Sequence, residues 1–205
     1  MNKYRSNEII QKLITIIDNP RCELDYNNIF ELTVATILSA QTKDSRVNEV
    51  TKELFKICPD PKTMAEYDQE EIEKILKPLG LCKTKAKNII SLSKVLIGKY
   101  NGEVPNTLEE LITLPGIGRK TASVILVEGF KIPAIPVDTH VLRVAQRLGF
   151  SKSDDPIKVE EDLKRFIVVD NWIISHHLFI HFGRYHCTSR NPKCNGCVLK
   201  RYCKK

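Results

Sequence analysis

The sequence predicts an all-α protein, and three observations support this prediction. Apolar residues recur at intervals of three and four through most of the 205 residues. No run of strand length alternates apolar and polar residues in a convincing way. Capping residues before the apolar runs, and Pro or Gly after them, divide the chain into segments of helix length.

Six helices are predicted in the first half of the chain. They span residues 6–18, 29–40, 44–55, 63–67, 69–76 and 83–99. Asp44 is expected to cap the third of them, and a Pro-rich break at 59–61 separates the third from the fourth. The last is amphipathic, and its lysines are expected to lie largely outside the apolar face: Lys83, Lys85, Lys87 and Lys94.

Residues 107–129 predict two helices joined by a tight turn. Thr107 and Glu110 have the spacing of a capping box for the first helix. Gly116 and Gly118 allow positive φ and a close backbone approach in the turn. The amides that begin the second helix are then free to face an anion. An ordinary helix–turn–helix corner is the plainer interpretation of the same pattern.

Asp138 is predicted to begin a further helix. It follows Pro136 and precedes a run with helical periodicity, which consists of Val141, Leu142, Val144, Ala145 and Leu148. A helix N-terminus favours an ionised carboxylate. Asp138 therefore fits a simple cap as well as a functional carboxylate.

The charge distribution favours a polyanionic partner. The chain has 32 basic and 25 acidic residues, a formal net charge of +7. Residues 111–205 hold 16 of the basic and 8 of the acidic residues, and residues 183–205 hold seven basic residues and no acidic one. Such a balance is typical of nucleic-acid-binding proteins. No apolar run is long enough for a membrane span and the start lacks a signal peptide, so we expect no membrane partner and a cytoplasmic location.

Four of the seven cysteines gather near the end of the chain, as Cys187, Cys194, Cys197 and Cys203. Without a secretion signal, clustered thiols favour a metal site over disulfide bonds. Four thiolates suit either tetrahedral zinc or an iron–sulfur cluster. The C-x6-C-x2-C-x5-C spacing favours the iron–sulfur cluster and leaves zinc open.

Several of these motifs together resemble one family. Residues 114–120 (LPGIGRK) resemble the helix–hairpin–helix of the endonuclease III family of DNA glycosylases, and residues 137–140 (VDTH) resemble its catalytic segment. Residues 38–41 (LSAQ) and 79–81 (LGL) are similar to its DNA-penetrating loops, and the four cysteines match its iron–sulfur loop. The motifs occur in the family's order. Ser123 and Phe182 depart from the pattern, which commonly has Asn and His there.

The resemblance implies a set of site residues. Lys120 is the expected nucleophile and Asp138 the catalytic carboxylate. Gln41 is expected to fill the space of a flipped base and Leu81 to wedge into the stack. The remaining expected DNA contacts are Gly116, Gly118, Arg119 and His140, and the hairpin also allows a monovalent cation. The four cysteines would hold a 4Fe-4S cluster.

The resemblance also implies fold and function. The fold would be that of a helix–hairpin–helix DNA glycosylase with two helical domains and a cleft between them: residues 22–133 as a six-helix barrel, and residues 1–21 with 134–205, including the iron–sulfur loop at 187–203. The function would be base excision repair by a monomeric DNA glycosylase and abasic-site lyase that removes oxidised pyrimidines from duplex DNA. Mismatched thymine or uracil, or pyrimidine dimers, are alternative substrates. A non-catalytic DNA-binding module is a third interpretation.

Overall fold

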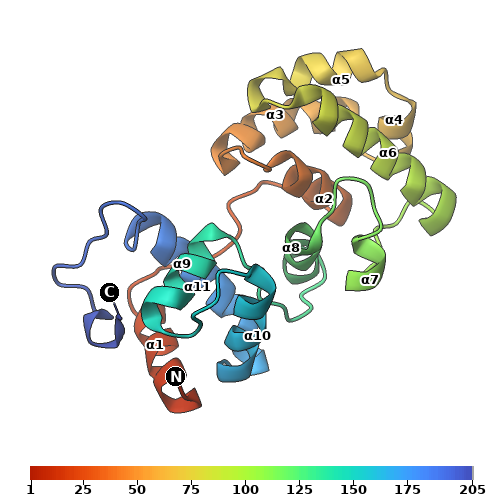
Figure 1. The fold of residues 1–205 in the computed structure, drawn as a ribbon. Coiled ribbons are helices and arrows are strands. Elements are labelled where there is room, and N and C mark those ends of the chain that lie inside the picture. Colours follow the sequence, from red (N-terminus) through yellow and green to blue (C-terminus); the bar gives the residue numbers. More distant parts are fainter. Residues whose placement is uncertain (205) are drawn as a thin grey trace. The chain divides into compact units, whose positions relative to one another are not determined.

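The computed structural model describes residues 1–204, and within them every regular element is a helix (Figure 1). Lys205, the last of the seven basic residues near the end of the chain, lies outside the described residues. The all-α prediction is confirmed. The α-helices are α1 Lys3–Ile14, α2 Ile29–Leu38, α3 Asp44–Ile57, α4 Pro61–Glu66, α5 Gln69–Leu76, α6 Cys82–Tyr100, α7 Leu108–Leu111, α8 Arg119–Gly129, α9 Thr139–Leu148, α10 Pro156–Phe166 and α11 Trp172–Tyr185. Short 3₁₀ turns are η1 Lys77–Leu79, η2 Val169–Asn171 and η3 Lys200–Tyr202.

The chain divides into two compact units. Unit 2 consists of Glu23–Ile132, and unit 1 joins Met1–Cys22 to the chain from Pro133 onward. In unit 2, α4 and α5 pack on α6, and α2 packs on α3 and α8. In unit 1, α11 packs on α1 and α9, and α9 also contacts α10. Segments from the two ends of the chain therefore share one core.

Each unit has its own apolar core. Unit 2 buries α2 almost completely, because Leu32, Val34 and Leu38 have no exposed surface. In unit 1, α1 and α11 contribute the fully buried Ile9 and Phe179. This burial explains the apolar periodicity, since the hydrophobic effect stabilises each helix mainly through its packed face.

Local signals account for most helix boundaries. Side chains of Asn2, Asn28 and Asp60 accept amide hydrogen bonds at the starts of α1, α2 and α4. Asn2 moves the start of the first helix to Lys3, before the predicted residue 6, and the helix ends at Ile14, not at residue 18. Its end precedes a β-branched run, which disfavours continuation of a helix.

Two sequence predictions in unit 2 are wrong. Asp44 is the first residue of α3 and not its cap, because Lys43 occupies the capping position without a side-chain hydrogen bond. Lys85 is 3% exposed although its charge predicted an outward position. The other three lysines of α6 that were predicted to face outward, Lys83, Lys87 and Lys94, are exposed. Lys85 is buried because its ammonium finds oxygen acceptors in two neighbouring loops.

Candidate functional site

The hairpin of unit 2 presents an open helix N-terminus. After α7, the chain turns through Gly116, which has φ of 78°, and enters α8 at Arg119. Gly118 occupies the capping position of α8 and supplies no side-chain hydrogen bond to this helix end. Lys120 is the second residue of α8 and is exposed. A primary amine therefore lies in the first turn of a helix, where the backbone favours a nearby anion.

Gly116 is required by its surroundings as well as by its backbone angle. A Cβ at this position would lie 3.0 Å from Cβ and 3.1 Å from Nδ2 of Asn88, on α6. A larger residue would therefore require the Asn88 side chain or the turn to shift by a few tenths of an ångström. The hairpin is thus seated directly against α6, and Asn88 is a neighbour of the turn that the sequence analysis missed.

In unit 1, Asp138 caps α9 with one carboxylate oxygen. Its Oδ1 accepts hydrogen bonds from the amides of His140 and Val141, each at 2.8 Å. Its Oδ2 makes no hydrogen bond within the described chain, and the side chain is half-buried. Asp138 is therefore both the cap that the sequence allowed and a carboxylate with one oxygen available for other chemistry.

Two contacts from α11 hold the start of α9. His176, which is buried, donates from Nδ1 to the carbonyl of Pro136 at 2.9 Å. Gly183 allows α11 to approach α9, since a Cβ there would lie 2.9 Å from Cβ of His140. The backbone before Asp138 and the first turn after it are thus supported by one helix.

The two loops expected to enter DNA both lie in unit 2 and both have unusual backbones. Gln41, between α2 and α3, has φ of 55°, and Leu81, before α6, has φ of 50°. Non-glycine residues rarely adopt this left-handed region, and such positions persist only where the surroundings enforce them. Gln41 is exposed, and Leu81 is 58% exposed in spite of its apolar side chain.

The four cysteines near the end of the chain line one cavity in unit 1, of about 90 Å³. Phe182 and His186 also line this cavity, and their rings stack with centroids 4.9 Å apart. Burial, and the three neighbouring thiols less strongly, raise the pKa of Cys197 despite a hydrogen bond with the backbone of Leu199. The tertiary structure therefore brings together the four cysteines that the sequence grouped.

Two arginines of α9 hold the cysteine loop. Arg147 donates to Sγ of Cys187 at 3.2 Å and to the carbonyls of Thr188 and Ser189 at 2.8 and 3.1 Å. Arg143 donates to the carbonyls of Cys187 at 3.0 Å and Gly183 at 2.8 Å. The helix that Asp138 begins thus also anchors the loop that begins at Cys187.

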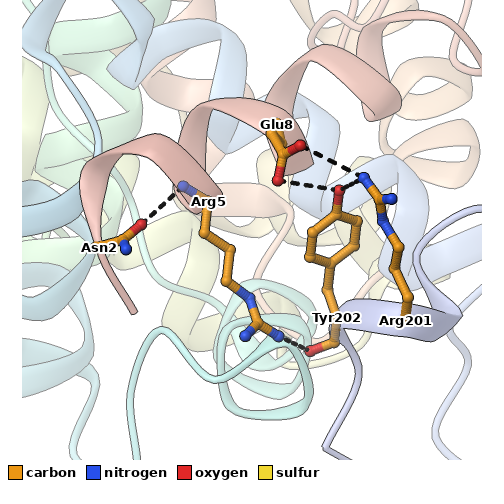
Figure 2. Close-up of polar contacts among 5 residues, drawn as sticks. All are labelled: Asn2, Arg5, Glu8, Arg201 and Tyr202. Carbon is orange, nitrogen blue, oxygen red and sulfur yellow. Dashed lines mark hydrogen bonds and ion pairs between the residues drawn. The ribbon is translucent and has the colours of Figure 1, made fainter.

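Figure 2 shows how the end of the loop is tied to α1. Tyr202 donates from its hydroxyl to Glu8 at 3.2 Å, and its carbonyl accepts from Arg5 at 2.9 Å. Arg201 contacts Glu8 at 3.4 Å and also donates to the Tyr202 hydroxyl. Asn2 caps the same helix by accepting from the amide of Arg5. These residues join the first and last segments of the chain.

Comparison with known proteins identifies the family. Residues 34–168 match the family model of the HhH-GPD superfamily base excision DNA repair proteins. The endonuclease III of Rickettsia conorii is 46% identical over 201 residues, which cover 96% of this chain and 95% of that protein. The endonuclease III of Escherichia coli K12 is 38% identical, with 99% and 96% coverage. The chain belongs to the endonuclease III family.

Solved structures of the endonuclease III family agree with this assignment. A trapped covalent intermediate of an endonuclease III with DNA matches with a TM-score of 0.95 and 43% identity, over 100% of this chain and 96% of that one. A non-covalent endonuclease III–DNA complex matches equally well. A thermostable thymine-DNA glycosylase, at 20% identity and a TM-score of 0.88, shares the fold. The predicted helix–hairpin–helix glycosylase fold is therefore confirmed.

Several residues around these sites could not be identified from the sequence. Arg143 and Arg147 stand four residues apart in α9, and their spacing places them on one face of the helix. Lys85 carried no signal, because a charged side chain in an amphipathic helix normally faces solvent.

None of the described helices is long and apolar enough to cross a membrane.

Proposed function

We propose that this protein is a bifunctional DNA glycosylase and abasic-site lyase that removes oxidised pyrimidines from duplex DNA in base excision repair. The observation that carries the proposal is the exposed amine of Lys120 in the first turn of α8, directly after the hairpin. A glycosylase that only hydrolyses the base needs an activated water, whereas a lyase needs an amine that forms a Schiff base. Lys120 meets the second requirement.

In this mechanism, unprotonated Nζ of Lys120 attacks C1′ of the damaged nucleotide. The bond from C1′ to the base breaks, and the base leaves with the electron pair and takes up a proton. The C1′–O4′ bond then breaks as Nζ forms a Schiff base with C1′, and O4′ takes up the proton that Nζ releases. Loss of a C2′ proton then expels the 3′ phosphate by β-elimination, and water releases Lys120. This sequence nicks the strand without an external nucleophile.

Asp138 would stabilise the positive charge that develops on the sugar. Its Oδ1 is occupied by two amides, which hold the carboxylate in place. Its Oδ2 is then the oxygen that interacts with the sugar. The proposal includes the predicted domain assignment, in which Lys120 belongs to residues 22–133 and Asp138 to the second domain.

The other expected residues would bind and deform the DNA. The hairpin, with Gly116, Gly118 and Arg119, would hold a DNA phosphate at the N-terminus of α8, directly or through a monovalent cation. His140 accepts from Arg143 at Nδ1, at 3.1 Å, so its Nε2 carries the proton and can donate to DNA. Gln41 and Leu81 are exposed side chains that can replace a flipped base and open the stack.

A 4Fe-4S cluster fits the cysteine cavity better than a single zinc ion does. Among residues 1–204, no three or more Cys, His, Asp or Glu side chains converge on the position of one ion. A four-iron cluster is larger, so its four thiolates stand around a cavity, as these do. Nε2 of His186 is buried beside them without a partner in the described residues, and Arg147 donates to Sγ of Cys187. Both suit hydrogen bonds to cluster sulfurs.

When bound, the cluster would supply iron–thiolate bonds that fix the basic loop from Cys187 to Cys203. The chain's own residues would present this loop to the DNA backbone, with Arg190, Lys193 and Lys200 as its cations. Phe182, one of the departures from the family pattern, is buried against the same cavity. Ser123, the other departure, is buried in α8.

Borohydride trapping tests the proposal directly. Duplexes carrying thymine glycol, uracil opposite guanine, a pyrimidine dimer or an abasic site are each incubated with the cluster-loaded protein and reduced. We expect a covalent adduct on the thymine glycol and abasic duplexes, which Lys120→Gln abolishes and Lys94→Gln, an exposed control on α6, retains. Preference for another lesion would select the alternative substrates. No nicking and no adduct on any duplex would leave only a DNA-binding role.

A second measurement tests the cluster. Visible absorbance from thiolate-to-iron charge transfer and about four irons per chain are expected. Cys194→Ser should lower both, whereas Cys22→Ser, at a cysteine outside the cavity, should not. One zinc per chain and no visible band would contradict the assignment.

A further inference from the structure

Lys85 is a buried cation whose two acceptors lie in different loops. It is 3% exposed, on the first turn of α6. Its Nζ donates to the carbonyl of Leu79 at 3.0 Å and to Oγ1 of Thr42 at 2.9 Å. The Thr42 hydroxyl in turn donates to the same Leu79 carbonyl at 2.9 Å. These three residues, here called the loop junction, connect positions 37 residues apart in sequence.

The loop junction lies beside the two residues with left-handed backbones. Gln41 immediately precedes Thr42, and Leu81 follows Leu79 by two residues. Each of these conformations is strained and is kept only where neighbouring contacts enforce it. In unit 2, the loop junction supplies those contacts to both loops at once.

Lys85 has no ion pair within the described chain, and burial lowers the pKa of its ammonium. Burying an unpaired cation is expensive, and a lysine at a purely structural position is normally paired or exposed. Lys83, Lys87 and Lys94 of the same helix are exposed. An apolar residue in place of Lys85 would avoid the desolvation cost but would remove the donor that the Leu79 carbonyl and the Thr42 hydroxyl share.

We propose that Lys85 is a positioning residue that holds the Gln41 and Leu81 loops in one arrangement, ready to enter DNA together. The inference rests on the proposed function. Flipping a base out of the stack costs a few kcal/mol, and the side chains that fill the vacated space recover part of it. If the two loops are already ordered before DNA binds, no conformational entropy is lost in ordering them. More of the recovered energy is then kept for flipping the base. Lys85 therefore acts on the flipping step and not on the chemistry at C1′.

The test compares a paired lesion with an unpaired one. Lys85→Met keeps the length of the side chain and removes its donors, Thr42→Val removes the bridging hydroxyl, and Lys87→Met is the exposed control on α6. Single-turnover base release is measured on thymine glycol in a full duplex and on the same lesion inside an unpaired bubble. Fluorescence of 2-aminopurine next to the lesion reports the opening of the stack.

On the duplex, Lys85→Met should release the base roughly 10- to 100-fold more slowly than wild type, as expected for a small misplacement of positioned groups. Its 2-aminopurine signal should fall in parallel. On the bubble its rate should stay within about twofold of wild type, because the flipping cost is least for an unpaired base. Thr42→Val should show the same pattern more weakly, and Lys87→Met should match wild type on both.

A double-mutant cycle adds a second criterion. In the Gln41→Ala, Leu81→Ala background, Lys85→Met should cause little further loss, because the groups it positions are gone. The inference would be overturned if Lys85→Met lost the same rate of base release on duplex and bubble, or if its duplex rate equalled that of wild type. It would also be overturned if the loss from Lys85→Met added to the losses from Gln41→Ala and Leu81→Ala. If Lys85→Met does not fold, Thr42→Val decides by the same criteria. A wild-type protein inactive on both substrates would instead refute the proposed function.

Discussion

Asp138 has two roles that substitutions can separate. Its Oδ1 accepts from the amides of His140 and Val141 at 2.8 Å each, while Oδ2 makes no hydrogen bond in the described chain. Asp138→Asn keeps a carbonyl oxygen at the capping position and removes only the charge, so it should cost about 0.3–1 kcal/mol in the free energy of unfolding. Asp138→Ala leaves both amides without their acceptor and should cost about 1–2 kcal/mol.

The effect on catalysis should follow the charge and not the cap. Removing one group that stabilises transition-state charge typically lowers the rate by about 10²–10³, or about 2.7–4 kcal/mol. Asp138→Asn and Asp138→Ala should therefore both lose at least that much in single-turnover base release from a thymine glycol duplex. Urea unfolding of the same preparations supplies the stability values.

Asp155 offers a matched control in the same unit. It caps α10 by accepting from the amide of Ile157 at 2.9 Å. Asp155→Ala should lose about 1 kcal/mol of stability, as a lost cap does, without any loss of rate. A rate for Asp138→Asn within threefold of wild type would refute the catalytic role. A rate loss for Asp155→Ala like that of Asp138→Ala would mean that activity simply follows the stability of the unit.

Three further predictions concern the surroundings of the sites. Gly116→Ala should lose about 1–2 kcal/mol of stability because a Cβ is strained at φ of 78°. Its DNA affinity should also fall in a salt-titrated binding assay. Gly118→Ala should lose less stability, because a new Cβ there would have nothing within 4 Å. Burial raises the pKa of Cys58 from 9.0 to about 11. The Cys58 thiol should therefore resist labelling by iodoacetamide at pH 8, as followed by mass spectrometry, and fast labelling would contradict this. Because the thiol loses its proton at lower pH in the unfolded chain, the contribution of Cys58 to stability should decrease as pH rises from 9 to 11. Tyr202→Phe should cost about 0.5–1.5 kcal/mol through the lost hydroxyl bond, whereas Tyr4→Phe, at 76% exposure, should leave the melting temperature unchanged; equal shifts would refute the tether to α1.

Local chemistry made much of the fold predictable. Helix α6 was predicted at residues 83–99 and is observed at Cys82–Tyr100, because periodicity and capping depend on neighbours in sequence. The hairpin was predictable for the same reason, since Gly116 is needed for a turn that its immediate neighbours define. The grouping of the cysteines was also local, because all four belong to one loop.

Lys85 and Arg147 show where sequence reasoning ended. Lys85 was predicted outside the apolar face because a charge alone favours solvent, and only the packing of two distant loops around its ammonium explains its burial. Arg147 lies 40 residues before the Cys187 sulfur to which it donates. The contacts of Lys85 and Arg147 cannot be predicted from sequence spacing, because they depend on which distant segments the apolar cores bring together.

The sequence by itself determined the helices, the hairpin, the cysteine loop and the candidate Lys120 and Asp138, because each depends on residues close together in the chain. The tertiary structure alone decided that one oxygen of Asp138 caps α9 while the other is left for chemistry. It also decided that α9 anchors the cysteine loop and that a buried lysine joins the Gln41 and Leu81 loops. These features depend on hydrogen bonds between distant segments, whose partners are set by how the apolar faces pack.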